Sequence, residues 1–176
     1  MPDNVKLDIF NPIDMNRIKY FAILLLLVTW PLLGQDMGKI PIQTWEGKTI
    51  TPQSWIDGKT PFVVSFWFAT CKYCFEEMDA VAERFADWYG VIPFRFIGVC
   101  TDDARSIAKA KAVCRSRGWD DFQFYFDTNK AYARAMNVAS MPHLFLFDRE
   151  GKLVYTHIGY APGDEDRLYE QLLKLK

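Results

Sequence analysis

The chain has 176 residues, half of them hydrophobic, and a formal net charge of −1. This length suits one ordinary domain with a short appendage, and the near-zero charge, without a basic cluster, argues against nucleic-acid binding and electrostatic attachment to a membrane surface. Four cysteines are too few for a disulfide-stapled scaffold of this length, so catalysis and metal binding are the roles to test.

The N-terminal part of the chain predicts a targeting segment. A short positive stretch precedes an apolar run that ends before Gly34. The run is shorter than the roughly 18 residues of a confident membrane-spanning helix, and its basic flank is typical of a signal peptide. We therefore expect export, with residues 15–34 acting either as a cleaved signal peptide or as a membrane anchor through 18–33. Residues 1–14 are interpreted as an upstream extension, with Met15 as an alternative true start.

The folded domain, predicted over 35–176, is expected to begin its regular structure near Ile40. Residues 40–51 predict a small hairpin that turns at Gly47, and a short helical turn opening with a proline follows it. The segment 62–68 is almost wholly apolar, as is typical of a central strand covered on both faces.

A helix is predicted over 72–88, because apolar residues recur there at helical spacing. The apolar stripe consists of Cys74, Met78, Val81, Phe85 and Trp88. We place the acidic residues of this helix, Glu77 among them, on its other faces. Tyr89 and Gly90 are expected to end it.

The rest of the chain alternates between strand and helix patterns. Strands are predicted over 94–100, 122–126, 143–147 and 153–158, and helices over 104–117, 129–136 and 164–175. Asp164 is a candidate cap of the last helix, whose leucines should face inward. The alternation predicts parallel strands joined by helical crossovers, and therefore an α/β fold.

Two cysteines, Cys71 and Cys74, lie three residues apart where the first long strand meets the first long helix. At such a junction a C-x-x-C pair can form a reversible disulfide. The helix N-terminus stabilises a thiolate on Cys71, which we predict to be the nucleophile, and Lys72 adds positive charge beside it. Cys74, one turn further into the helix, is predicted to be the resolving thiol.

Binding of a metal by this pair would need two further soft ligands, and the sequence offers no second C-x-x-C and no adjacent histidine. We therefore expect neither a metal nor a cofactor. Cys100 and Cys114 are predicted to be buried and unbridged, because the helical rise carries the second away from the first. His143 and His157 are interpreted as structural histidines.

The order of elements, together with the stretches 66–74 (FWFATCKYC) and 141–152 (MPHLFLFDREGK), resembles the thioredoxin superfamily over about 40–176. Within it the chain looks most like the exported TlpA-like and ResA-like thiol-disulfide oxidoreductases. The resemblance implies a central mixed sheet flanked by helices, with an N-terminal β-hairpin extension and the TlpA-like strand-helix insertion. It also implies a cis bond between Met141 and Pro142, where the Met141 backbone can pair with a substrate. Tyr73 either belongs to this docking surface or is an ordinary exposed aromatic residue.

The chain departs from the thioredoxin pattern at two positions. Thr70 stands where thioredoxins have tryptophan, and Ser65 stands where many have a buried aspartate. The second departure leaves open which group takes the proton from Cys74. Asp102 and Asp103 are the nearest acidic candidates, with Thr101 equally alignable, although we favour helix capping as the role of these aspartates.

We predict from these observations an exported enzyme that exchanges disulfides with protein cysteines, acting as a reductase. Its partners would be protein thiols or disulfides and an upstream electron donor in the membrane or envelope. The direction of exchange depends on the reduction potential of the cysteine pair. The alternative is a binding or chaperone module for copper, haem or unfolded polypeptide that uses the same scaffold without turnover.

Overall fold

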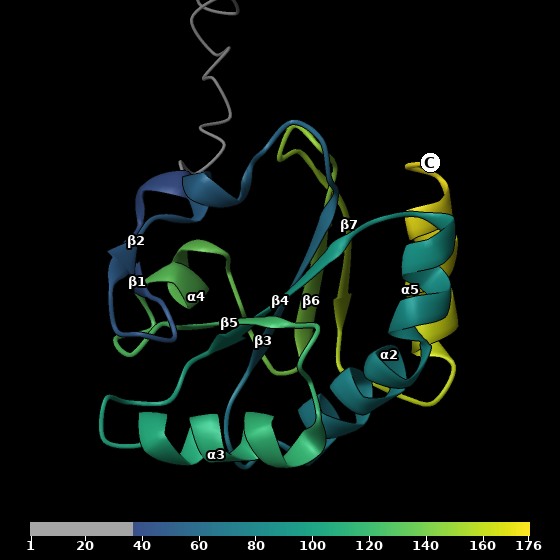
Figure 1. Ribbon diagram of the computed structural model, residues 1–176. Coiled ribbons are helices and arrows are strands. Elements are labelled where there is room, and N and C mark those ends of the chain that lie inside the picture. Colours follow the sequence, from purple (N-terminus) through teal and green to yellow (C-terminus); the bar gives the residue numbers. More distant parts are fainter. Residues whose placement is uncertain (1–36) are drawn as a thin grey trace, which may run out of the picture. The chain divides into compact units, whose positions relative to one another are not determined.

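The computed structural model of the protein describes residues 37–176 (Figure 1). The predicted upstream extension and targeting segment lie outside the described residues. Seven strands form one mixed sheet in the order β2-β1-β5-β4-β3-β6-β7. Their bounds are β1 Ile42–Gln43, β2 Thr49–Ile50, β3 Phe62–Trp67, β4 Arg95–Cys100, β5 Gln123–Phe126, β6 His143–Phe147 and β7 Leu153–Ile158.

The helices lie on both faces of this sheet. They are α2 Lys72–Val91, α3 Ile107–Arg117, α4 Ala131–Ala135 and α5 Asp164–Leu173, with two short 3-10 helices, η1 Met37–Lys39 and η2 Pro52–Trp55. Strands β3, β4 and β5 run parallel, whereas β6, β7 and β1 are antiparallel to their neighbours. The expected fold class, a thioredoxin-like α/β domain with an N-terminal hairpin, is confirmed.

Central strand β3 divides the core into two halves because successive side chains point to opposite faces. Val63 and Trp67 pack in the cluster formed with α2, α3 and α5. Val64 and Phe66 pack in the other cluster, with η2 and α4. Figure 1 shows α2 and α5 on the same side of the sheet, and residues of both contribute to the first cluster. Ser65 shares the face of Val63 and Trp67, so its hydroxyl points beneath α2.

The end of α2 differs from the prediction. Gly90 lies inside the helix, which continues to Val91, so the expectation that Tyr89 and Gly90 end it was wrong. The residue before a proline is pushed out of the helical region by the proline ring. Ile92 precedes Pro93 and is extended, with φ −141° and ψ 111°. The proline, rather than the glycine, therefore sets the end of this helix.

Gly98 in β4 is required by close packing. A Cβ atom at this position would lie 2.6 Å from the ring of Phe124 and 3.3 Å from the Trp67 Nε1 atom. The first distance is shorter than real Cβ atoms show and the second is tighter than most of them, so glycine lets Trp67 and Phe124 lie against this strand. Within residues 37–176, none of the helices is long and apolar enough to cross a membrane.

Candidate active site

The two cysteines of the C-x-x-C motif are joined by a disulfide at the start of α2, with their Cα atoms 5.3 Å apart. Cys71 is the N-cap of the helix, and the Cys74 backbone N–H lies 3.2 Å from its sulfur. This confirms the predicted placement at a helix N-terminus, where backbone N–H groups stabilise a thiolate. Cys71 is 5% exposed and Cys74 is fully buried, so an incoming partner can reach only Cys71.

Lys72 and Tyr73, between the cysteines, lie at the surface. The Lys72 side chain is 79% exposed, and its Nζ atom is 3.5 Å from a carboxylate oxygen of Glu76. Solvent and this carboxylate both weaken the effect of the ammonium on Cys71, so the helix N-terminus remains the stronger stabiliser of a thiolate. Tyr73 is 57% exposed, and its ring is available beside the cysteines.

The Met141–Pro142 peptide is cis, as the resemblance implied. Because β6 runs antiparallel to β3 and pairs His143 with Phe66, this peptide lies beside the end of β3, just before the cysteine loop. Thr101 connects the two segments. Its hydroxyl lies 3.3 Å from the Trp67 carbonyl and 3.4 Å from the Met141 sulfur.

Asp102 and Asp103 have different roles. The Asp103 carboxylate accepts hydrogen bonds from backbone N–H groups in the turn before α3, including that of Ser106 at 3.1 Å, as expected for a capping residue. The Asp102 carboxylate instead accepts the Ala69 N–H at 2.6 Å and the Cys100 thiol at 3.3 Å. The capping role predicted for Asp102 was therefore wrong, because its side chain turns back to hold the loop that carries Cys71.

Glu77 is the residue that the sequence analysis missed. Although we expected it on a polar face, it is only 3% exposed, and the Ser65 hydroxyl donates to its carboxylate at 2.6 Å. Burial raises the Glu77 pKa to about 8; the Ser65 hydrogen bond opposes this shift and the charge of Asp164 adds to it. The structure thus places a buried acid on α2, three residues after Cys74 and hydrogen-bonded to Ser65, where many thioredoxins have a buried aspartate.

Comparison with known proteins identifies the family. A model of the Redoxin family matches residues 37–173, which is most of the chain. The chain belongs to the Redoxin family. A search of curated proteins found no match.

Solved structures place this Redoxin protein among thioredoxin-like proteins. An uncharacterized thioredoxin-like protein from Porphyromonas gingivalis is 34% identical, with a TM-score of 0.70 over 77% of this chain and 88% of that one. A putative thiol:disulfide interchange protein DsbE from Chlorobium tepidum is 22% identical, with a TM-score of 0.66 over 77% and 92%. A secreted Mycobacterium tuberculosis disulfide oxidoreductase is 17% identical, with a TM-score of 0.62 over 80% and 98%. These last two similarities show the shared fold.

The other two cysteines of this Redoxin protein are free and buried, which confirms that they are not bridged. Burial raises the pKa of the Cys100 thiol well above its usual range and that of Cys114 to about 12. His143 matches its predicted structural role only in part. Its Nε2 atom lies 3.1 Å from the Thr156 hydroxyl, whereas its buried Nδ1 atom has no partner within the described part of the chain.

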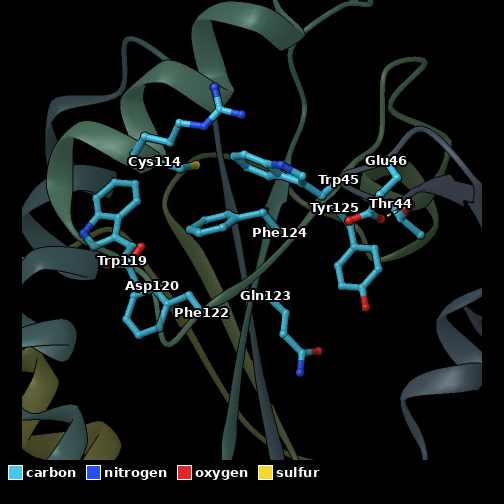
Figure 2. Close-up of a pocket in the computed structure, with 11 residues that line it drawn as sticks. Thr44, Trp45, Glu46, Cys114, Trp119, Asp120, Phe122, Gln123, Phe124 and Tyr125 are labelled. Carbon is cyan, nitrogen blue, oxygen red and sulfur yellow. Dashed lines mark hydrogen bonds between the residues drawn. The ribbon is translucent and has the colours of Figure 1, made fainter.

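This Redoxin protein has a pocket of about 390 Å³, and neither Cys71 nor Cys74 is among the residues that line it (Figure 2). Trp45, Trp119 and Phe124 line it, and the Trp119 ring also packs against Trp67 and Phe75. No histidine or methionine is among its lining residues. Across residues 37–176, no three His, Cys, Asp or Glu side chains are grouped so that they could hold a metal ion.

Proposed function

We propose that this protein is a thiol-disulfide oxidoreductase that acts on protein cysteines in the cell envelope, as a reductase, through Cys71 and Cys74. The observation that carries this proposal is the disulfide at the N-terminus of α2, in which Cys71 is the one cysteine of the pair that reaches the surface. Only the thiolate attacks a disulfide, and the helix N-terminus favours that form. The buried Glu77 beside the pair supports chemistry that needs a proton acceptor.

The exchange begins when the Cys71 thiolate attacks a substrate disulfide. A bond forms between Cys71 and one substrate sulfur, and the other substrate sulfur leaves with the electron pair and takes a proton from water. Cys74 then loses its proton to the Glu77 carboxylate and attacks the Cys71 sulfur. This step restores the Cys71–Cys74 disulfide and releases the second substrate sulfur, so that the substrate gains two electrons and the enzyme loses them.

Glu77 suits the role of proton acceptor by position and by pKa. It follows Cys74 by three residues on α2, so the two side chains share one face of the helix. A pKa of about 8 lies near that of a thiol, and a matched pair of groups can pass a proton in either direction. Glu77 therefore takes the role of the buried aspartate that many thioredoxins have at the position of Ser65.

Substrate binding is assigned to Met141, Pro142, Lys72 and Tyr73. The Met141 backbone is positioned to pair with an extended segment of the partner, in the manner of strand addition. A groove of about 520 Å³ begins at Met141 and is lined by Phe68, Asp102 and Lys130, among others. It gives the residues that flank a substrate cysteine room to lie beside Cys71.

The envelope location and the reductive direction rest on resemblance. Residues 16–33 have the basic flank and apolar core of a targeting segment, and one structural neighbour is described as secreted. The TlpA-like pattern supports reduction, with electrons supplied by an upstream donor in the membrane or envelope. The reduction potential of the Cys71–Cys74 couple, measured against the potential of its compartment, tests the direction.

A trapping experiment tests the enzymatic function. In a Cys74→Ala variant, Cys71 should hold partner proteins in mixed disulfides that dithiothreitol releases, because no resolving thiol remains. The Cys71→Ala variant should trap none and should lose reduction of insulin. If wild type and Cys71→Ala reduce insulin equally, the proposal is wrong.

A further inference from the structure

The carboxyl of Glu77 forms part of the wall of a small cavity between α2, β7 and α5. The cavity has a volume of about 10 Å³, which is close to the space that one water molecule needs. Five other titratable side chains line it, namely Tyr155, His157, Tyr160, Asp164 and Glu165. Neither cysteine of the disulfide is among the lining residues.

A hydrogen-bonded pair connects this cavity with the surface. The His157 Nε2 atom lies 3.1 Å from a carboxylate oxygen of Asp164. The His157 side chain is 27% exposed and that of Asp164 is 15% exposed, so both can exchange protons with water. Arg167 lies 3.2 Å from the other Asp164 oxygen, and Tyr160 donates to Glu165 at 2.9 Å, so the carboxylates of the cluster are partnered.

Glu77 has no comparable access to solvent through the disulfide side. Cys74 is fully buried, Cys71 is 5% exposed, and Glu77 itself is 3% exposed. A protonated carboxyl cannot accept the proton of Cys74, so the proton on Glu77 must leave before the resolving step.

We propose that the His157–Asp164 pair is the outlet through which Glu77 exchanges its proton with solvent, by way of one water in the cavity. This rests on the proposed function of the cysteine pair. Before Cys74 attacks Cys71, the carboxyl proton of Glu77 moves to the cavity water, the water passes a proton to the imidazole of His157, and the imidazolium releases it to bulk water. No electrons move in these steps, and the carboxylate is regenerated. His157 and Asp164 are positioning residues, since they do not touch the sulfur atoms.

The groups around Glu77 fit this transfer. Ser65 on β3 donates to the carboxyl, and Cys74 is on the same helix. On the cavity side, Tyr155 and Tyr160 have pKa values raised by burial, so they remain neutral. The charge of Asp164 favours a proton on Glu77, and the Asp164 carboxylate lies 3.1 Å from the His157 Nε2 atom, so it also holds the imidazole in place.

The test follows the resolving step by stopped-flow, starting from a mixed disulfide of Cys71 with a small thiol. His157→Gln and Asp164→Asn are compared with Asp166→Asn, which removes a carboxylate two residues away that pairs with Arg84 on the surface. We expect the two outlet variants to slow the step by about tenfold or more, in keeping with the loss of a proton-transfer group. Added imidazole should restore the rate of His157→Gln, because it can deliver and remove protons at the opened site. Asp166→Asn should match wild type.

A cavity-filling variant tests the outlet without replacing His157 or Asp164, so the proposal stays testable if those two variants misfold. Val81 lines the cavity, and Val81→Leu would displace the water while leaving every titratable group in place. It should slow the step to a similar extent without rescue by imidazole.

If the outlet variants and Val81→Leu resolve the mixed disulfide as fast as wild type, the outlet is disproved. A shifted pH midpoint with an unchanged maximal rate and no imidazole rescue also disproves it, because His157 would then act through charge alone. Wild type that cannot resolve the mixed disulfide would instead overturn the proposed function.

Discussion

At the scale of single residues, the buried carboxyl of Glu77 is unfavourable for folding but useful for the proposed chemistry. Removing a carboxylate from water is unfavourable unless hydrogen bonds replace the lost solvation. Ser65 supplies one such bond, and the pKa still rises to about 8. The charge that forms on Glu77 at alkaline pH therefore destabilises the fold, and the same carboxylate is the proton acceptor that we propose for Cys74.

Glu77→Gln should change how stability depends on pH. Since the folded-state pKa is raised above the usual value of 4.5 to about 8, the folded protein binds the proton more tightly, so wild type loses stability as pH rises from about 4.5 to about 8. The uncharged amide avoids this loss, and we expect a gain on the order of 3 kcal/mol near pH 8 and almost none at pH 4. Urea unfolding of the oxidised protein at several pH values measures this difference. Glu76→Gln, at the exposed neighbouring position, should follow wild type. If stability depends on pH in the same way in Glu77→Gln and in wild type, the raised pKa of Glu77 is contradicted.

The same substitution should slow the enzyme. Without a carboxylate next to Cys74, the resolving thiol has no base, and the resolving step should fall by about 10²-fold, the lower end of the range for general base catalysis. Attack by Cys71 on a small disulfide should be unchanged. Separate stopped-flow measurements of the two steps provide the comparison. A variant that slowed both steps equally would indicate a general disturbance of the site rather than loss of a base.

At the scale of elements, the active site depends on how three strand ends are held together. Asp102, after β4, binds the Ala69 N–H in the loop after β3, and Thr101 binds both the end of β3 and Met141 before β6. The side chains at the cysteine loop are thus fixed by residues far away in sequence. Close packing of β4 against Trp67 belongs to the same arrangement.

Two glycine substitutions test that packing. Gly98→Ala would force a Cβ atom to within 2.6 Å of the Phe124 ring, and we expect a loss of about 1–3 kcal/mol from overpacking. Gly90→Ala is the matched control, because its Cβ would meet nothing within 4 Å and alanine favours a helix interior. That control should gain up to roughly 0.5–1 kcal/mol. Chemical unfolding of both variants measures the contrast, and equal stabilities would show that β4 can move away from Trp67.

Helices and strands could be predicted from the sequence where a local pattern of residues determines them. Continuous apolar residues identified β3, and spacing identified α2 and its buried stripe. The end of α2 was misjudged because Gly90 was given more weight than Pro93, whose effect on Ile92 decides the boundary. Cys74 and its partner were found from spacing and position alone.

The roles of Glu77 and Asp102 could not be read from local patterns. The spacing of Glu77, three residues after Cys74, was a usable signal, but its significance appears only when Ser65 is seen on the facing strand. Asp102 lies where capping residues are common, and only the approach of Ala69 in space reveals its other partner. Both depend on contacts between distant parts of the chain.

At the scale of the whole molecule, one cysteine of the four stands at the N-terminus of a helix, where backbone N–H groups favour its thiolate. Cys74 and Cys100 are fully buried, whereas Cys114 is 5% exposed, as Cys71 is, but burial raises the pKa of the Cys114 thiol to about 12. A thiol with a raised pKa in an apolar environment reacts slowly, whereas one at a helix N-terminus reacts fast. The fold thereby separates the redox pair from the cysteines that only fill space.

Alkylation of the reduced, folded protein tests this separation. We expect iodoacetamide to modify Cys71 first and almost exclusively, with a rate that falls as pH drops below the pKa of its thiol. Mass spectrometry of the digested protein identifies the labelled residues, and a Cys100→Ser, Cys114→Ser double variant provides the control. Equal labelling of Cys100 in wild type would contradict the burial of its thiol.

The alternation of side chains along β3 has a consequence for folding fidelity. A slip of one residue along this strand would turn Ser65 to the opposite face and place an aliphatic side chain beneath α2. The Glu77 carboxyl would then be enclosed without its hydrogen-bond donor, a penalty of about 1–3 kcal/mol in addition to the lost packing. A single hydroxyl thereby discourages misaligned sheets, and the hydrogen bond between Ser65 and Glu77 also marks the correct alignment of strand and helix during assembly.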